Sequence, residues 1–309
     1  MALMRSMLLA ASQNLWLRNH AVKFPFVRRS VSRFMPGETL DAALACAQAL
    51  LAKKIGTIFT HLGENVADRA EARSVSDHYV QVLERIHQAG LPTEVSVKLT
   101  QLGLDLSVDY CFENLKRILQ RENSAKTVWV DMEASNYVDA TLEIYKRALK
   151  KYPDAGICLQ AYLYRTKKDL DDLLSLRPSI RLVKGAYKEP ASIAFPKKAD
   201  VDANYFALAQ EMLRTQAAGN CLRAAFGTHD VPLIHRMLDF VKSQGIAKER
   251  FEVEMLYGIQ RVEQERLAQE GYRSVVLVAY GSYWYPWFVR RLAERPANVW
   301  FLFRNVFSS

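Results

Sequence analysis

The chain has 309 residues, of which 50% are hydrophobic and 24% are charged. This composition allows a large buried core and excludes a disordered chain, and the 13 glycines and 10 prolines follow no period that would indicate collagen or a low-complexity protein. The 42 lysines and arginines exceed the 33 acidic residues, so the net charge is +9. That charge suits an anionic ligand, a nucleic acid or an acidic membrane surface, and it does not choose among them.

The four cysteines, at positions 46, 111, 158 and 221, form no CxxC pair. This spacing argues against a zinc ribbon, a thioredoxin motif and a disulfide scaffold, and it is typical of reduced thiols in a cytosolic protein. No run of about 18 apolar residues is present, so no membrane-spanning helix is predicted. The first residues lack a convincing signal-peptide cleavage site. We therefore expect a cytoplasmic protein.

The N-terminal segment, residues 1–36, is predicted to form a helical arm that carries Arg28, Arg29 and Arg33. A solvated arm is the simpler interpretation. The alternative is a peripheral contact with the inner face of the membrane, based on the apolar and basic character of the arm. A regular pattern begins after Gly37, and we assign residues 37–309 to one catalytic domain.

Eight short apolar runs alternate with helix-like segments through this domain, and each run is rich in β-branched or aromatic residues. Such alternation predicts parallel strands with right-handed crossovers, and eight units in about 250 residues predict an α/β fold, a closed (β/α)8 TIM barrel. The alternative, an open doubly wound sheet, is disfavoured because no two glycines have the spacing that the GxGxxG motif requires. The runs cover residues 56–64, 94–103, 127–133, 156–162, 180–187, 222–230, 251–258 and 274–281.

Polar residues cluster at the predicted carboxyl ends of these strands, where barrels of this kind place their active sites. Because several strand ends contribute them, we expect one shared site that attracts a carboxylate or a phosphate. The residues are Lys98, Asp131, Gln160, Lys184, Tyr187, Thr228, His229 and Asp230, followed by Arg290 and Arg291 after the eighth strand.

Three other kinds of site compete with this interpretation. A metal site would need His61 and His229 with carboxylates from distant strands, so no metal is expected. A Schiff-base barrel aldolase is a real competitor, because Lys98 and Lys184 lie on strands, where a desolvated lysine becomes nucleophilic. Nucleic-acid binding is not expected, since the basic residues are scattered and no known binding motif is present.

At the same strand ends the chain resembles the flavin-dependent proline dehydrogenases, in their monofunctional bacterial form. The matching segments fall in family order over roughly residues 37–300, and RLVKGAY together with the late RRLxE is the most specific part. The resemblance implies a distorted (β/α)8 barrel that binds FAD without a covalent bond. The segments are SVKLTQLGLDL (96–106), VWVDMEAS (128–135), CLQAYLYRT (158–166), RLVKGAYKEP (181–190), GTHD (227–230), EMLYG (254–258) and YPWFVRRLAERP (285–296).

The resemblance also implies which residues contact the flavin. Arg181 would lie near the edge of the isoalloxazine ring, where its charge stabilises the reduced ring. Gly185 and Ala186 would let the backbone approach the cofactor closely, while Lys198 and His229 suit the pyrophosphate and the ribose. The full set is Met132, Gln160, Arg181, Val183, Lys184, Gly185, Ala186, Lys198, Thr228, His229 and Glu294.

The substrate contacts implied in the same way belong to a pocket for a small cyclic amino acid. Paired arginines offer fork geometry for its carboxylate. Glu64 matches a family glutamate that pairs with the first arginine as a gate. We assign catalytic roles to Asp131 and Arg181, and we assign no general base. The implied substrate contacts are Lys98, Asp131, Tyr187, Leu256, Arg290 and Arg291.

The implied reaction is the oxidation of L-proline to Δ1-pyrroline-5-carboxylate, with a hydride passing from C5 of the ring to flavin N5. The cofactor supplies the electron chemistry, while the protein positions the ring and excludes water. Electrons would then pass to a quinone, and the basic N-terminal helices would touch the membrane that carries it. No second domain for oxidation of the product fits in the chain, so we expect a monofunctional enzyme.

Two positions depart from the family pattern. Leu277 replaces a tyrosine that stands four residues before the glycine ending the eighth strand, and Trp287 replaces a tyrosine three residues before the first arginine. Both family tyrosines line the substrate ring, so we count Leu277 and Trp287 as substrate-binding positions. A change from polar to apolar at a ring contact alters discrimination by about 10–200-fold. The alternative substrate is therefore a related ring such as 4-hydroxyproline.

Overall fold

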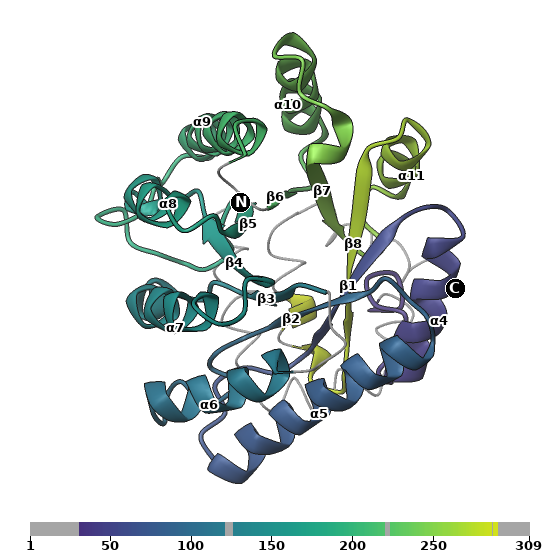
Figure 1. Cartoon of the computed structure of the whole chain (residues 1–309), viewed down its shortest axis with the longest axis vertical. Helices are drawn as coiled ribbons and strands as arrows, with labels where there is room; N and C mark the ends of the chain where they lie inside the picture. The colour runs from purple at the N-terminus through teal and green to yellow at the C-terminus, as the bar shows by residue number, and fades with distance from the viewer. Residues whose placement is uncertain (1–30, 121–125, 220–222, 286, 290–309) are drawn as a thin grey trace, which may run out of the picture.

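The computed structural model describes residues 31–120, 126–219, 223–285 and 287–289, and within them a sheet of eight parallel strands closes on itself. Each strand pairs with the next one along the chain, and β8 pairs with β1 through six residue pairs from Gly56–Val275 to His61–Tyr280. Helices surround this ring of strands (Figure 1). The predicted (β/α)8 barrel is therefore confirmed, and each of the eight predicted runs overlaps one strand.

The strands are short, and the candidate site lies at their carboxyl ends. They are β1 (Gly56–His61), β2 (Glu94–Val97), β3 (Val128–Val130), β4 (Ala155–Gln160), β5 (Ser179–Val183), β6 (Arg223–Gly227), β7 (Phe251–Leu256) and β8 (Arg273–Tyr280). The helices are α4 (Leu40–Leu51), α5 (Arg69–Gln88), α6 (Val108–Leu119), α7 (Val138–Leu149), α8 (Thr166–Leu174), α9 (Lys198–Ala217), α10 (Val231–Ser243) and α11 (Arg261–Gln269), with short 3-10 turns η1 (Ser135–Tyr137) and η2 (Lys248–Arg250).

Several helices begin at a side chain that caps them. Thr39, Asp68, Ser107 and Asp230 each stand directly before a helix, and the side-chain oxygen of each accepts a hydrogen bond from a backbone N–H of the first turn. Such caps satisfy donors that the helix itself leaves unpaired, and each stabilises its helix by about 1 kcal/mol. These positions fix where each crossover helix starts after its loop.

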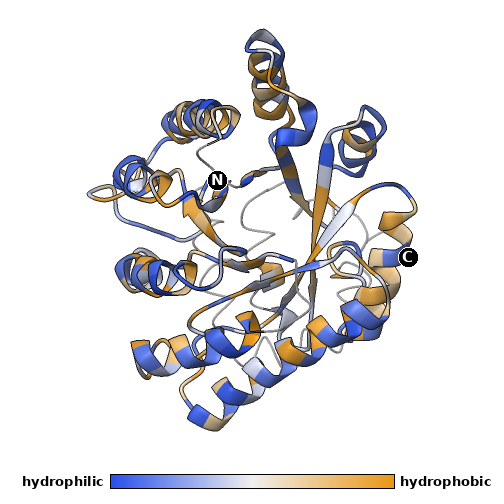
Figure 2. Cartoon of the chain, in the orientation of Figure 1, coloured by the Kyte–Doolittle hydropathy of each residue, from blue (hydrophilic) through white to orange (hydrophobic). Residues whose placement is uncertain are grey.

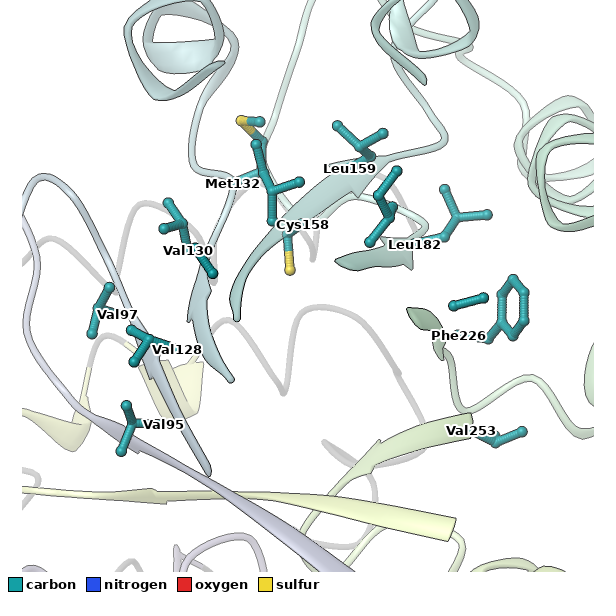
Figure 3. Close-up of a cluster of buried hydrophobic side chains, with 14 of the residues drawn as sticks. Val95, Val97, Val128, Val130, Met132, Cys158, Leu159, Leu182, Phe226 and Val253 are labelled. Carbon is teal, nitrogen blue, oxygen red and sulfur yellow. The ribbon is translucent and has the colours of Figure 1, made fainter. Parts of the chain in front are cut away.

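The main core lies between the sheet and the helices. Alternate strand residues point outward, and a helix such as α6 meets them with Cys111, Leu115 and Ile118, which are buried at helical spacing. Figure 3 shows part of this layer from β2 to β7. The helices carry hydrophobic residues on one side and hydrophilic residues on the other (Figure 2), as expected for a ring of helices around a barrel.

The inside of the barrel has a separate small core. Ile58, Trp129, Ala225 and Val275 are buried together there, with Leu277 packed against them. This cluster forms a middle layer of the interior, so the polar residues that follow it along the strands gather at the carboxyl ends.

The end of the predicted arm packs against the barrel. Val31, Phe34 and Met35 are buried in one cluster with Trp284 and Phe288, which follow β8. The rings of Phe34 and Phe288 lie 6.0 Å apart. Residues 1–30 lie outside the described part of the chain, so the boundary at residue 36 stays a prediction. Among the described residues, no helix is long and apolar enough to cross a membrane.

The contact between the arm and the barrel requires a glycine at position 258. Gly258 has φ +79°, and a Cβ there would lie 1.7 Å from the backbone carbonyl oxygen of Arg33. We expect Gly258→Ala to lower the free energy of unfolding by on the order of 3 kcal/mol, measured by urea denaturation. Gly271→Ala is the control, because Gly271 also has a positive φ of +84° but a Cβ added there would meet no atom within 4 Å, so about 1 kcal/mol is expected. Equal losses in the two variants would contradict a tight contact at Arg33.

Candidate functional site

A cavity of about 410 Å³ opens at the carboxyl ends of the strands. Side chains or backbone from all eight strands or the loops that follow them line it, so the site predicted from the strand ends exists as one space. The predicted site residues that line it are Glu64, Lys98, Asp131, Met132, Gln160, Arg181, Val183, Lys184, Gly185, Ala186, Tyr187, Lys198, Thr228, His229, Leu256, Leu277 and Trp287. Arg290, Arg291 and Glu294 lie outside the described residues, and their roles stay predictions.

Asp131, directly after β3, accepts from three nitrogen or oxygen donors and, at 3.7 Å, from the thiol of Cys158. Ser96 Oγ donates to its Oδ1 at 2.6 Å, Lys98 Nζ donates to its Oδ2 at 2.9 Å, and Arg181 Nη1 donates to Oδ1 at 3.2 Å. Burial acts to raise the pKa of Asp131, but the charges of Lys98 and Arg181 outweigh it and hold that pKa below its usual value. The Asp131 carboxylate is therefore ionised at neutral pH.

Lys98, directly after β2, stays charged in this setting. Burial acts to lower the pKa of Lys98, but the negative charge of Asp131, with contributions from Tyr187 and Glu64, raises it above the ordinary lysine value. Only the neutral amine of a lysine attacks a carbonyl, so a raised pKa disfavours Lys98 as a nucleophile.

Arg181, in the middle of β5, lies at the base of the cavity and is only 3% exposed. Its Nε lies 2.6 Å from Oε2 of Glu254 on β7, and its guanidinium carbon lies 4.5 Å from the centre of the Trp129 ring below it. Its Nη2 is buried and has no hydrogen-bond partner among the described residues. Arg181 is thus held between Glu254 and Trp129, and its Nη2 remains as a donor for a group in the cavity.

Lys184 and Lys198 form a second group of charges at one side of the cavity. Both lysines pair with Asp202 and Asp230: Lys184 Nζ lies 2.7 Å and Lys198 Nζ 2.9 Å from Asp230 Oδ2. Partial burial acts to raise the pKa of Asp230, but the hydrogen bonds from the two lysines lower it to about 2. Two lysines at one point suit a phosphate group, which would share them with the two aspartates.

His229 is oriented by backbone contacts between two loops. Its Nε2 accepts a hydrogen bond of 2.9 Å from the backbone N–H of Leu256, and its carbonyl oxygen accepts one of 3.3 Å from Gln260. With Nε2 as acceptor, the proton of the neutral ring is on Nδ1. His229 therefore ties the loop after β6 to the end of β7, which holds both segments at the cavity.

Some cavity residues were not predicted from the sequence. Glu254, Cys158 and Thr60 line the cavity, and Ser96 and Trp129 support it from beneath. A signal for Glu254 was available: in the strand FEVEML, two glutamates alternate with apolar residues, and alternation places them on one face. Since the outer face of a barrel strand is covered by helices, glutamates on one face of β7 had to point inward.

Some polar atoms at the cavity wall have no hydrogen-bond partner among the described residues. Gln160 donates through Nε2 to the carbonyl oxygen of Met132 at 3.1 Å, and this leaves its buried Oε1 without a partner among the described residues. Arg181 Nη2 is a buried donor in the same state. Buried polar groups cost about 1–3 kcal/mol when unpaired, so unmatched acceptors and donors at a cavity wall indicate a ligand with both kinds of group.

Comparison with known proteins gives the family. The family model described as proline dehydrogenase matches residues 43–304. The chain belongs to the proline dehydrogenase family. It is 40% identical to proline dehydrogenase 2 of Bacillus subtilis (strain 168) over 280 residues, which are 90% of this chain and 91% of that one. It is 39% identical to proline dehydrogenase of Deinococcus radiodurans over 280 residues, 89% of each chain.

Solved structures agree with this fold. Proline utilization A from Bdellovibrio bacteriovorus, in a crystal structure of the protein inactivated by N-propargylglycine, superposes with a TM-score of 0.79 at 25% identity. The match covers 87% of this chain and 33% of that longer one. The chain is therefore a proline dehydrogenase, an oxidoreductase of proline catabolism, and the family is flavin-dependent in general.

The ion pairs of Asp131 predict a large effect of removing its charge. In Asp131→Asn, Lys98 loses its partner, and Arg181 loses one of its two carboxylates. We expect kcat/KM for L-proline to fall about 10²-fold or more, because small misplacements at a reacting centre have effects of this size. Asp105→Asn is the control, since Asp105 accepts only from Tyr137 and Asn65 in an exposed loop among the contacts described. A wild-type value for Asp131→Asn would remove it from the site.

Proposed function

We propose that the chain binds FAD in this cavity and oxidises L-proline to Δ1-pyrroline-5-carboxylate. The observation that carries the proposal is the pair of buried, unmatched polar atoms, Gln160 Oε1 and Arg181 Nη2, at the wall of a cavity that every described predicted residue lines. A flavin ring edge carries both hydrogen-bond acceptors and a donor, so it matches these atoms. When bound, the flavin supplies the acceptor for a hydride.

The protein residues divide into two groups around that proposal. Arg181 and Gln160 would hold the ring, and Lys184 with Lys198 would hold the pyrophosphate, since the cavity brings each pair to one place. Gly185 has φ +107°, a backbone conformation that side-chain-bearing residues rarely adopt. A Cβ there would lie 2.2 Å from Cδ1 of Tyr162, so a glycine is required for packing against that ring, and the close approach to the cofactor rests on the family resemblance.

The substrate would lie over the ring, against Lys98, Asp131, Tyr187 and Leu256. Lys98 and Asp131 keep opposite charges 2.9 Å apart at the cavity wall, so they would orient a polar substrate. Arg290 and Arg291 would bind the substrate carboxylate, and Glu64, which lines the cavity, would act as their gate. The electron acceptor we propose is a quinone, reached from the cytoplasmic face of the membrane through the N-terminal arm.

A Schiff-base aldolase is disfavoured by the same contacts. Lys98 has a raised pKa beside Asp131, and Lys184 is paired with Asp202 and Asp230. Lys98 therefore does not supply the neutral amine that attacks a carbonyl, and the amine of Lys184 is held between two carboxylates.

An absorption spectrum tests the cofactor and the substrate together. We expect the purified protein to be yellow, with a flavin band that bleaches when L-proline is added without oxygen. FAD, rather than FMN, should be released on denaturation. A colourless protein that cannot be reconstituted with FAD would overturn the proposal, and a flavin band that L-proline leaves unchanged would overturn the substrate alone.

The substrate ring contacts are tested at positions 277 and 287, which both line the cavity. We expect Leu277→Tyr or Trp287→Tyr to change the ratio of kcat/KM for L-proline to that for trans-4-hydroxy-L-proline by about tenfold or more, because a hydroxyl is added at a ring contact. Trp287 also belongs to the cluster that holds the arm, so the melting temperature of each variant is the control. Ratios within twofold of the wild type for both would show that these positions do not set specificity.

A further inference from the structure

Glu254 is a buried carboxyl at the base of the cavity that the reaction outlined above does not use. It is the fourth residue of β7, its side chain is 3% exposed, and it lines the cavity. Its Oε2 lies 2.6 Å from Arg181 Nε. Its Oε1 is buried and has no hydrogen-bond partner among the described residues.

Asp131 and Glu254 share the positive charge of Arg181, and the two carboxyl groups differ in the number of their other partners. Asp131 accepts from Ser96 and Lys98 as well as from Arg181, so its negative charge is well matched. Glu254 has Arg181 alone as a cation within salt-bridge distance among the described residues. A buried carboxylate with one shared cation and one unmatched oxygen is protonated more readily than a carboxylate with several donors. Of the two carboxyl groups, Glu254 is therefore the one that more readily becomes neutral.

The groups that surround Glu254 add to this effect. Glu252 lies two residues earlier on the same face of β7, and Glu94 on β2 contributes a further negative charge. Arg223 on β6 offsets them, but it is already paired with both Glu94 and Glu252, and Arg273 on β8 also pairs with Glu252. The remaining titratable neighbours, Cys158 on β4 and Tyr205 on α9, are neutral at physiological pH because burial raises the pKa of each.

We propose that Glu254 is a positioning residue for Arg181 that works in its neutral, protonated form, which leaves the guanidinium charge available to an anionic ligand. As a neutral acid it still holds Arg181 in place through its carbonyl oxygen. When it ionises, its charge cancels that of Arg181 and weakens the hold on the ligand. The inference rests on the proposed function, since the anionic ligand beside Arg181 would be the flavin after it has received the hydride.

The direction of the pH effect follows from the burial of Glu254. Burial raises the pKa of Glu254 to about 8, although Arg181 acts to lower it. Glu254 is therefore mainly protonated below about pH 8 and ionised above it. A negative charge placed beside Arg181 disfavours the ionised form further, so ligand binding and proton retention support each other.

Infrared spectroscopy of the holoenzyme tests the protonation directly. We expect the carbonyl stretch of a protonated carboxylic acid at about pH 7 and its loss at about pH 10, with this band absent from Glu254→Gln. Glu252→Gln is the matched control on the same strand. It should keep the band but shift its titration to lower pH, because a neighbouring negative charge is removed. If Glu254→Gln does not fold, the shift in Glu252→Gln alone tests whether Glu254 is the titrating group.

The pH profile of flavin reduction gives the second readout. The rate of reduction by L-proline in the wild type should fall about tenfold per pH unit above the titration point, and Glu254→Gln, which resembles the protonated acid, should lose that fall while keeping the rate at about pH 7. A wild-type profile in Glu254→Gln, or a wild-type infrared band that does not titrate, would overturn the role of Glu254 and leave the cofactor proposal intact. Absence of a flavin band from the wild type would overturn both.

Discussion

The interior of the barrel depends on one buried cation, the guanidinium of Arg181. A buried charge at 3% exposure is strongly unfavourable unless partners surround it, and here the Asp131 carboxylate, the carboxyl group of Glu254 and the ring of Trp129 do so. Asp131 and Glu254 come from strands on either side of β5, and Trp129 comes from β3. The contacts that surround the charge of Arg181 therefore connect β3, β5 and β7 at the base of the cavity.

Trp129 separates two groups of charges along the barrel axis. Arg181 lies over its ring at 4.5 Å, and Arg223 lies over it at 5.2 Å, with Glu94 and Glu252 as the partners of Arg223. The indole N–H donates to Glu94 at 2.9 Å, so the ring cannot rotate without losing that bond. The floor of the site is thus held by residues near the amino-terminal ends of β2, β6 and β7, two to four positions before Lys98, Gly227 and Glu254, which line the cavity.

Much of this arrangement could be predicted from the sequence, because it follows from patterns within short segments of the chain. Strand runs and helices differ in period, so eight strands were visible, and polar residues such as Lys98 and Asp131 follow their strands directly. In a parallel barrel every carboxyl end meets at one mouth, so position along each strand was enough to bring these residues together. The family resemblance then named Arg181, which is buried within a strand and gives no local sign of a role.

What could not be predicted depends on contacts between distant elements. The approach of Arg33 to Gly258 joins residues that are far apart in the chain, and nothing near either residue indicates the other. The pairing of Glu254 with Arg181 required knowing that both point inward at the same height. Residue type alone is also a poor guide to the role of Glu254. Glu252, two residues earlier on β7, pairs with two arginines, whereas Glu254 pairs with one arginine, which it shares with Asp131. The same residue type on the same face therefore serves as a structural anion in the floor and, one layer higher, as an acid whose proton decides how much of the charge of Arg181 reaches the cavity.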